Sequence, residues 1–417
     1  MKIENVRAYL LSYPFAQPIR LPYFGGERTL VKRDAMLIRV ATGAGLVGYA
    51  PGPGEPSALA AIERVIAPFL EGRTLADPDA LRIRFLEGPG TDAALAKIYC
   101  SVEIALYDLL GKARGVSVSE LIGGRVRDRI RLYGSAGMYM APESYAAEAS
   151  AVAAMGFQAY KMRSALGPEG DLDAVARIRQ AVGPDFDLMV DAHTWWRMGD
   201  RNYSLETIEE LAEAMAGHNI AWLEEPLPPD DHAAYLALKE KDIVPLAAGE
   251  HEPSEERYLH LILTHAVDYV QMDVCCQGGY AIGRRLLGEI ARQGLRFAFH
   301  SWGTALEVVA AAHLGICWPE QVVEWLEYPF YSTSAHAGMY PFPLASEILR
   351  QPLELDHGSL VVPCGPGLGV EVDESVVERY PWQAGPWSYF RTEHPAEIRA
   401  VTGDHSVRWD ESTASGT

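Results

Sequence analysis

The chain has 417 residues, 48% of them apolar, and carries 36 lysines and arginines against 56 aspartates and glutamates, a net charge of −20. That length exceeds one ordinary domain and suits a large barrel with a smaller partner, and the apolar content provides a sizeable core. The acidic balance, without a basic face, excludes polyphosphate partners such as DNA.

The cysteine usage and the absence of targeting segments indicate the cell compartment. Five cysteines, an odd number without a CxxC pair, are typical of reduced thiols in the cytosol. The first residues lack a basic region followed by a long apolar core, so we expect no signal peptide. No run of 18 apolar residues occurs in the sequence. We therefore expect a cytoplasmic protein with neither a membrane nor a nucleic-acid partner.

Residues 1–128 are expected to form a compact α+β unit. Alternating apolar stretches punctuated by glycines predict strands within the first 50 residues. The segment 18–29, rich in Pro, Gly, Tyr and Arg, predicts a mobile loop between them. Helical periodicity covers residues 57–70 and 92–114, and Gly115 ends the second helix.

From residue 129 to about residue 350, short apolar strands alternate with amphipathic helices. The eight predicted strands are IRLYG, AYKMR, DLMVDAH, AWLEEP, PLAAGE, DYVQMDV, FAFHS and VVEWLE. This alternation is typical of a (β/α)8 TIM-type barrel. A doubly wound open sheet is the alternative, but its glycine motifs GxGxxG and GxxxxGK[ST] are absent. We therefore predict a barrel over residues 129–350 and a C-terminal segment, 351–417, that packs back on the N-terminal unit.

Nearly every predicted barrel strand ends in polar or ionisable residues. They are Lys161, Arg163, Asp191, His193, Glu224, Glu225, Glu250, Asp273, His300 and Glu327. In a TIM barrel the C-terminal strand ends form the floor of the active site. Burying so many charges around one opening is costly unless they pair or bind a metal. The pattern therefore predicts an active site at this end of the barrel.

Three acids on consecutive strands, Asp191, Glu224 and Glu250, indicate a metal site. Their oxygen ligands suit an octahedral cation that keeps positions open for water and substrate, and no Cys/His cluster suits zinc. Glu224 and Glu225 are neighbours on one strand, so only one can face inward, and the pattern leaves that choice open. By the same alternation, His251 is expected to face outward.

Two histidines at strand ends are candidate acid/base groups. Asp273 and His300 end successive strands, which would let the carboxylate orient the imidazole and raise its basicity. Residues two apart on a strand share a face, so His193 points into the same opening as Asp191. Both histidines are therefore expected at the mouth of the barrel.

These residues stand in motifs that resemble those of the mandelate racemase subgroup of the enolase superfamily, and the likeness covers nearly the whole chain. The matching elements are SVEIALYDLLGKARGVSVSELIGG, KMR at Lys161, VDAH at Asp191, LEEP at Glu224, AAGE at Glu250, MDxxxxGG at Asp273, HSWGT at His300 and WLEYP at Glu327. Each motif is weak alone, but together in this order they are highly specific. The resemblance implies an N-terminal capping domain over the barrel.

The resemblance also implies a cofactor and a set of roles. Mg²⁺ is implied as the cofactor, bound by Asp191, Glu224 and Glu250, which selects Glu224 over Glu225. The remaining implied roles fall on Asp273 and His300 as the acid/base dyad, Lys161 as the cation that neutralises the substrate carboxylate, and Glu327 as a hydrogen-bond partner of a carboxylate oxygen.

The capping loops are implied to close over the substrate. They correspond to residues 18–29 and 51–54, with Tyr23 and Arg28 as candidate specificity residues. A homo-oligomer is the tendency of the family.

Two departures from the racemase pattern favour dehydration. Arg163 stands where racemases of the group have a second lysine as base, and a guanidinium stays protonated. His193 stands where many relatives have asparagine, and some sugar-acid dehydratases of the family use a histidine there as the acid for the departing β-hydroxyl. One base and one acid describe β-elimination of an aldonic or aldaric acid through an enediolate, giving a 2-keto-3-deoxy acid. The alternatives are an epimerase, racemase or cycloisomerase of a carboxylate sugar and, outside catalysis, a binder of an acidic ligand.

Overall fold

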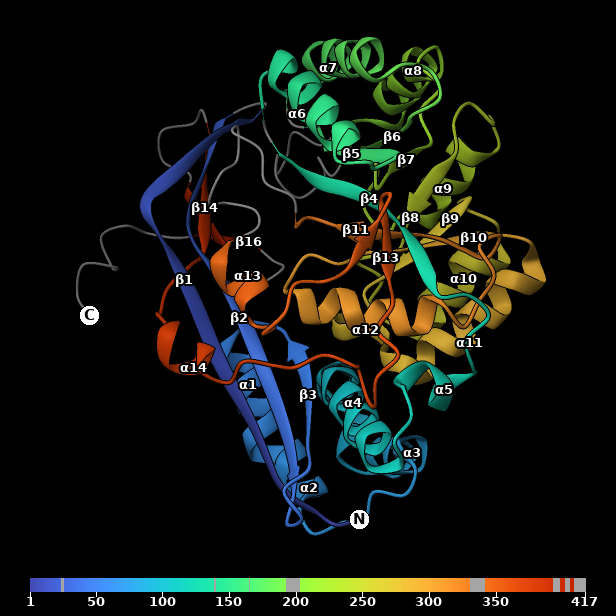
Figure 1. Cartoon of the computed structure of the whole chain (residues 1–417). Helices are drawn as coiled ribbons and strands as arrows, with labels where there is room; N and C mark the ends of the chain where they lie inside the picture. The colour runs from blue at the N-terminus through green and yellow to red at the C-terminus, as the bar shows by residue number, and fades with distance from the viewer. Residues whose placement is uncertain are drawn as a thin grey trace.

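The computed structural model describes residues 1–23, 26–138, 140–164, 166–192, 203–330, 342–392, 398–401 and 406–408. Eight parallel strands pair in chain order, and the last pairs with the first, so the sheet closes into a barrel (Figure 1). The strands are β4 (Arg129–Met138), β5 (Ala159–Arg163), β6 (Asp187–Asp191), β7 (Trp222–Glu224), β8 (Leu246–Ala248), β9 (Tyr269–Met272), β10 (Arg296–Phe299) and β11 (Val323–Tyr328). The predicted (β/α)8 barrel is confirmed.

An apolar layer with one residue from each strand fills the inside of the barrel. The residues are Tyr133, Ala159, Met189, Trp222, Ala247, Tyr269, Ala298 and Trp325. Side chains alternate between the two faces of a strand, so the residues two positions further along point inward as well. Those residues include Ser135, Lys161, Asp191, Glu224, Gln271, His300 and Glu327. The barrel interior thus changes from apolar side chains in this layer to polar and ionisable side chains in the next layer towards the C-terminal strand ends.

Seven helices surround the barrel. They are α6 (Pro142–Ala154), α7 (Pro168–Val182), α8 (Leu205–Ala216), α9 (His232–Lys239), α10 (Glu255–Leu263), α11 (Gly279–Gln293) and α12 (Ala305–Gly315). Proline at the first position begins α6 and α7, where its missing N–H is no loss. Gly294, at φ 69°, ends α11 in the left-handed region that glycine tolerates. Within the part of the chain described above, no helix is long and apolar enough to cross a membrane.

The N-terminal unit begins with three antiparallel strands, β1 (Ile3–Tyr23), β2 (Gly26–Thr42) and β3 (Val47–Gly52). The expected mobile loop at residues 18–29 is wrong, because the β1–β2 ladder continues from Ile19 opposite Leu30 to Tyr23 opposite Gly26. The strand conformation of this segment is explained by pairing with a strand that is distant in the sequence. Strand β14 (Ser388–Thr392) pairs with this end of β2 and extends the hairpin to three strands, beside its upper part in Figure 1.

Helices complete the N-terminal unit. They are α1 (Pro56–Ala61), a π-helical turn (Ile62–Ile66), α2 (Ala67–Leu70), α3 (Pro78–Leu86), a 3₁₀ turn (Pro89–Thr91), α4 (Ala93–Arg114) and α5 (Val118–Ile122). The side chain of Asp92 caps α4 by accepting from two backbone amides of its first turn. Gly115, at φ 70°, ends α4 as the sequence predicts.

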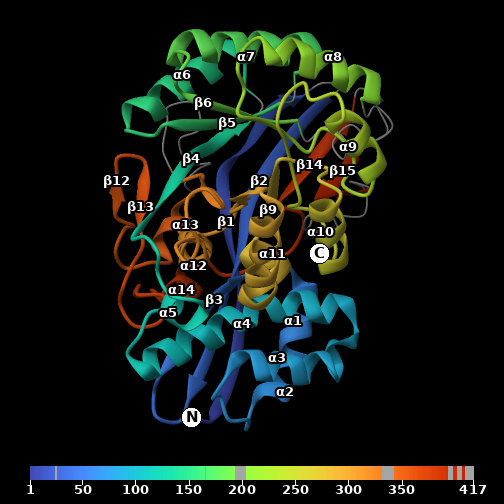
Figure 2. The ribbon, with the colours of Figure 1, turned by 90° about the vertical axis from the view of Figure 1, so that its right-hand side faces the viewer.

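Helix α4 is joined to the barrel segment that follows β9. Ser101 Oγ donates to the carbonyl of Cys275 at 2.5 Å, and the carboxylate of Glu103 accepts from the amide of Ala281 at 2.8 Å. Cys275 lies in a π-helical turn (Val274–Gly278) directly after Asp273. Figure 2 shows α11, which begins at the end of this turn, standing above α4 and α3. Through these two hydrogen bonds the N-terminal unit therefore supports the segment that follows Asp273 of the predicted dyad.

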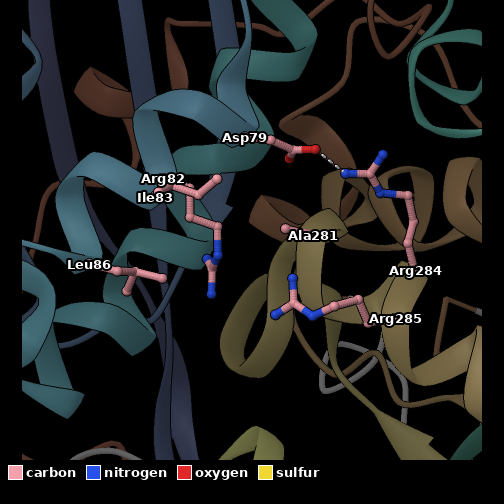
Figure 3. A pocket seen from close by; sticks show the side chains of 7 residues that line it. All are labelled: Asp79, Arg82, Ile83, Leu86, Ala281, Arg284 and Arg285. Atoms are coloured by element: carbon pink, nitrogen blue, oxygen red, sulfur yellow. Dashed lines mark hydrogen bonds and ion pairs between the residues drawn. The ribbon is translucent and has the colours of Figure 1, made fainter.

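A cavity of about 420 Å³ lies at the seam between α3 and α11, outside the barrel opening. Three arginines line it, and Figure 3 shows them projecting from the two helices. Each pairs with an acid: Arg82 with Glu103, Arg284 with Asp79, and Arg285 with Glu255. The Arg284–Asp79 pair joins α11 to α3, whereas Arg82 pairs within the N-terminal unit and Arg285 pairs with α10, so we interpret the cavity as part of the seam between the units.

The C-terminal segment touches both units. Strands β12 (Leu355–Asp356) and β13 (Ser359–Val361) form a hairpin that pairs with β4 of the barrel, while β14 pairs with β2. Strands β15 (Ile398–Val401) and β16 (Ser406–Arg408) extend the sheet beyond β14. The short helices α13 (Pro343–Glu347) and α14 (Val376–Arg379) lie between the barrel and these strands in the chain.

Candidate active site

The three candidate metal ligands lie together at the C-terminal ends of adjacent strands. Asp191 ends β6 and stands opposite Glu224, the last residue of β7, in the parallel register. Glu250 follows β8 by two residues. All three side chains are buried. Of the neighbouring pair, Glu224 contacts Lys161, whereas the chain turns at Glu225, whose φ is +40° and whose carboxylate lies near Glu250 and His251.

Two cations occupy the space between these acids and Glu327. Lys161 Nζ lies 2.5 Å from Glu224 Oε1 and 3.2 Å from Glu327 Oε1. Arg163 Nε lies 3.2 Å from Asp191 Oδ2, and its Nη2 lies 2.9 Å from Glu327 Oε1. Burial alone would lower the pKa of Lys161, but the carboxylates of Glu224 and Glu327 raise it above its ordinary value. Lys161 therefore stays protonated and can neutralise an anionic ligand.

The acids are electrostatically unlike one another. Burial raises the pKa of Glu224 to about 7, with Lys161 opposing the rise and the other carboxylates adding to it. Burial likewise raises the pKa of Glu250. Burial alone would raise the pKa of Glu327, but the neighbouring cations, Lys161 first, lower it to about 2. Glu327 therefore stays ionised, whereas at Glu224 and Glu250 the cost of burial outweighs the charges of the nearby cations.

That deficit fits a divalent cation on Asp191, Glu224 and Glu250. A cation would stabilise the ionised forms of Glu224 and Glu250, whose pKa values burial raises. The donors are all carboxylate oxygens on adjacent strand ends, which is the ligand chemistry of Mg²⁺ or Mn²⁺.

The candidate acid/base dyad has the geometry expected from the sequence. His300 Nδ1 lies 3.2 Å from Asp273 Oδ2. The other oxygen of Asp273 accepts from the amides of Cys275 and Cys276 at 2.7 and 2.9 Å, which fixes the carboxylate. The opposite ring nitrogen of His300, Nε2, lies 3.4 Å from Glu250 Oε2. Burial alone would lower the pKa of His300, but the carboxylates around it, Glu250 first, raise it to about 10.

Three features of the candidate active site were not predicted from the sequence. Ser135, on β4, donates to Glu327 and accepts from Arg163 at 3.0 Å. Trp222 Nε1 donates to Glu224 Oε2 at 2.9 Å, two positions before it on the same strand. The period-two pattern contained the Trp222 signal, since a tryptophan two residues before an acid shares its face.

The third feature is a pair that alternation misplaced. His251, expected to face outward, has its Nδ1 2.7 Å from Glu225 Oε2 and 3.5 Å from Glu250 Oε1. The expectation was wrong because β8 ends at Ala248 and Gly249 follows with φ 134°, so strand alternation no longer applies.

The remaining predicted residues are placed as follows. His193 lies outside the described residues. Tyr23 ends β1, and its side chain lies outside the described part of the structure. Arg28 is buried on β2, where its guanidinium lies 4.7 and 4.9 Å from the ring centroids of Trp387 and Phe390. These contacts join Arg28 to the C-terminal segment, and its role in specificity stays a prediction.

A closed barrel with a ring of carboxylates, two cations and a His–Asp dyad at its C-terminal strand ends defines a barrel enzyme site. Residues 144–376 match the family model described as enolase C-terminal domain-like, and residues 13–123 match that of the mandelate racemase / muconate lactonizing enzyme N-terminal domain. The chain belongs to the enolase superfamily, in its mandelate racemase subgroup.

Relatives of known activity span most of the chain. The D-galactarolactone cycloisomerase of Agrobacterium fabrum is 28% identical over 391 residues, covering 91% of this chain and 99% of the relative. The L-rhamnonate dehydratase of Saccharopolyspora erythraea is 29% identical over 352 residues, covering 79% and 80%. The crystal structure of the 3,6-anhydro-D-galactonate cycloisomerase from Zobellia galactanivorans has a TM-score of 0.78 at 27% identity, covering 92% of this chain and 100% of that one.

Proposed function

We propose that this protein is a Mg²⁺-dependent dehydratase that converts an aldonic or aldaric acid to its 2-keto-3-deoxy acid. The relatives described as sugar-acid dehydratases, at 26–29% identity, support this substrate class.

One observation carries the proposal: Glu327 separates a single base from two fixed cations. Its Oε1 contacts Lys161 and Arg163, while its Oε2 lies 3.8 Å from His300 Nε2. A substrate carboxylate on the cation side would bring its α-carbon towards the imidazole. Because Arg163 cannot act as a second base, the arrangement suits removal of the α-proton without its return on the opposite face.

The residues then divide the reaction. Lys161 neutralises the substrate carboxylate. A cation held by Glu250 would offset the carboxylate that most raises the pKa of His300 and so favour the neutral imidazole. His300 Nε2 then takes the C2 proton while Asp273 holds Nδ1–H. A bound divalent cation supplies positive charge that stabilises the enediolate. The C3–O bond breaks as the hydroxyl receives a proton and leaves as water, and the resulting enol gains a proton at C3 to become the ketone. His193 is proposed as the acid for the departing hydroxyl.

A panel of aldonic and aldaric acids tests the proposal. The full-length protein with Mg²⁺ is incubated with each acid in D₂O, and 2-keto acid is scored with a carbonyl reagent, with and without EDTA. We expect metal-dependent keto-acid formation from at least one acid. Metal-dependent deuterium exchange at C2 without keto acid, on every acid of the panel, would overturn dehydration.

Cycloisomerisation of a sugar lactone is the second candidate, because the D-galactarolactone cycloisomerase matches 91% of this chain at 28% identity. It too requires one base and a stabilised enediolate. Adding lactones to the panel separates the two, since a cycloisomerase consumes the lactone and leaves the corresponding free acid unchanged.

A further inference from the structure

Carboxylates and imidazoles alternate in a continuous run across the mouth of the barrel. Glu225 Oε2 lies 2.7 Å from His251 Nδ1, and the same nitrogen lies 3.5 Å from Glu250 Oε1. Glu250 Oε2 lies 3.4 Å from His300 Nε2, and His300 Nδ1 lies 3.2 Å from Asp273 Oδ2. Glu250 therefore stands between two imidazoles, with one carboxylate oxygen towards each.

The first member of the run occupies an unusual backbone position. Glu225 has φ +40°, a region that residues other than glycine, asparagine and aspartate rarely adopt. Its amide donates to the carbonyl of Ala247 at 2.9 Å, which ties this conformation to the neighbouring strand. The side chain is fully buried, and its Oε1 has no hydrogen-bond partner among the residues described. Strain and burial of this kind persist where the position of the group matters.

We propose that Glu225 and His251 form a positioning pair that holds Glu250 in the orientation in which it binds the cation. This rests on the proposed metal site of the dehydratase. The 2.7 Å hydrogen bond to Glu225 fixes the ring of His251, and the fixed ring borders Oε1 of Glu250. Without the pair, Glu250 would rotate more freely on its turn beyond β8, and binding a cation would cost more ordering entropy.

The same three residues admit a different use. Ligand atoms of Glu225, Glu250 and His251 all lie within 4.8 Å of one another, so the group itself resembles a cation site. The 2.7 Å contact between Glu225 and His251 favours the positioning role, because a proton in this hydrogen bond occupies Nδ1, the ring nitrogen that lies near both carboxylates. The number of Mn²⁺ ions bound per chain decides between a positioning pair and a second cation site.

Mn²⁺ binding to the metal-stripped full-length protein, followed by electron paramagnetic resonance, is the test. Glu225→Asn and His251→Asn remove the pair, and asparagine tolerates the positive φ at residue 225. We expect one Mn²⁺ per wild-type chain. Each variant should bind it about 10–100-fold more weakly, the loss typical of removing a partner of a metal ligand. The melting temperature of the metal-free variants should stay near that of the wild type.

Glu252, two residues beyond Glu250 on the same turn, belongs to a second pair that serves as a matched control. His232 Nε2 lies 2.5 Å from Glu252 Oε1, another buried imidazole–carboxylate pair, and His232 belongs to α9, away from the run. His232→Asn should leave Mn²⁺ affinity within about twofold of the wild type. The double variant Glu225→Asn/His251→Asn should bind no more weakly than the weaker single variant, since the two act as a unit.

Three results would contradict the proposed positioning role of Glu225 and His251. Wild-type affinity in both single variants would show that Glu250 needs no support. Two Mn²⁺ ions per chain, with the second lost in the variants, would make the group a cation site. An equal loss in His232→Asn would show general loosening of the turn. Absence of Mn²⁺ binding in the wild type would instead remove the metal-dependent function itself, so the two failures are distinguishable.

Discussion

The guanidinium of Arg163 stacks on the ring of Trp302, with its central carbon 3.7 Å from the ring centroid. Trp302 is two residues beyond His300, so one aromatic ring connects the cation side of the site with the loop that carries the proposed base. Arg33 of the N-terminal unit donates to the carbonyl of Trp302 at 3.3 Å. Trp302 is thus a contact point between the two units at the mouth of the barrel.

Trp302→Ala is expected to lower kcat/KM by about 2- to 30-fold, because a cation–π contact of this kind contributes about 0.5–2 kcal/mol. The loss should fall mainly on KM if Arg163 helps to bind the substrate carboxylate. Trp302→Phe should retain most of the activity, since phenylalanine keeps an aromatic face. Steady-state kinetics on the acid found by the panel would measure both, and wild-type kinetics in Trp302→Ala would contradict the stacking role.

Removal of the metal should abolish turnover and lower the melting temperature. Asp191, Glu224 and Glu250 then face one another without a cation, and binding to the folded state alone adds about 2.7 kcal/mol at a hundredfold excess over Kd. Mg²⁺ or Mn²⁺ should restore both properties after EDTA treatment and dialysis. A stripped preparation with full activity and an unchanged melting curve would refute the metal site.

His300→Asn should abolish exchange of the substrate α-proton as well as net turnover. Asparagine cannot accept the proton, while the surrounding carboxylates and the barrel floor are untouched. The circular dichroism spectrum should match that of the wild type. Exchange near the wild-type rate, measured by deuterium incorporation at C2, would assign the base to another residue.

His193→Asn separates the two halves of the reaction. If His193 protonates the departing hydroxyl, dehydration should fall by about 10²–10⁴-fold while His300 continues to exchange the α-proton. Deuterium incorporation and keto-acid formation would be followed in the same samples at saturating Mg²⁺. A parallel loss of both would contradict the role of His193 as a separate acid.

The buried His313 should make the free energy of unfolding depend on pH between about 6.5 and 4. It is fully buried on α12, where Nδ1 accepts from the amide of Ser119 at 3.3 Å and Nε2 faces the carbonyl of Leu368 at 3.0 Å. Burial lowers the pKa of His313 to about 4, so the unfolded chain binds a proton at higher pH than the folded one.

The contribution of His313 is therefore complete above about pH 6.5 and is lost as the pH falls towards 4, by about 3 kcal/mol in all. Urea unfolding between pH 7 and 4.5 would measure it against His313→Gln, which cannot titrate. The free energy of unfolding should fall more steeply with decreasing pH in the wild type, and equal slopes would contradict the prediction.

The barrel and its ring of charges were predictable because they follow local rules. The predicted strand AYKMR coincides with β5, and the inward positions two residues above the apolar layer carry Lys161 and Asp191 as strand alternation requires. What alternation could not supply was the choice between Glu224 and Glu225, since both are buried. Glu224 contacts Lys161, and its selection over Glu225 as a metal ligand stays a prediction from the motif.

Features that depend on non-local pairing or on positive φ could not be predicted. The segment 18–29 resembles a loop by composition, and its strand character comes from β14, which pairs with β2 from more than 350 positions away. The Glu225–His251 pair depends on turns at residues 225 and 249 that place two side chains where an extended strand would not.

The bonds from α4 to the segment after β9 have a consequence for attempts to recombine this enzyme with its relatives. Ser101 and Glu103 hold the backbone at Cys275 and Ala281, immediately downstream of the carboxylate that orients His300. An N-terminal unit transplanted from a relative to change substrate preference would therefore also alter the support of the proton-transfer machinery. A functional chimera should carry residues 273–281 together with the donor's N-terminal unit, treating the two stretches as one module despite their separation in the chain.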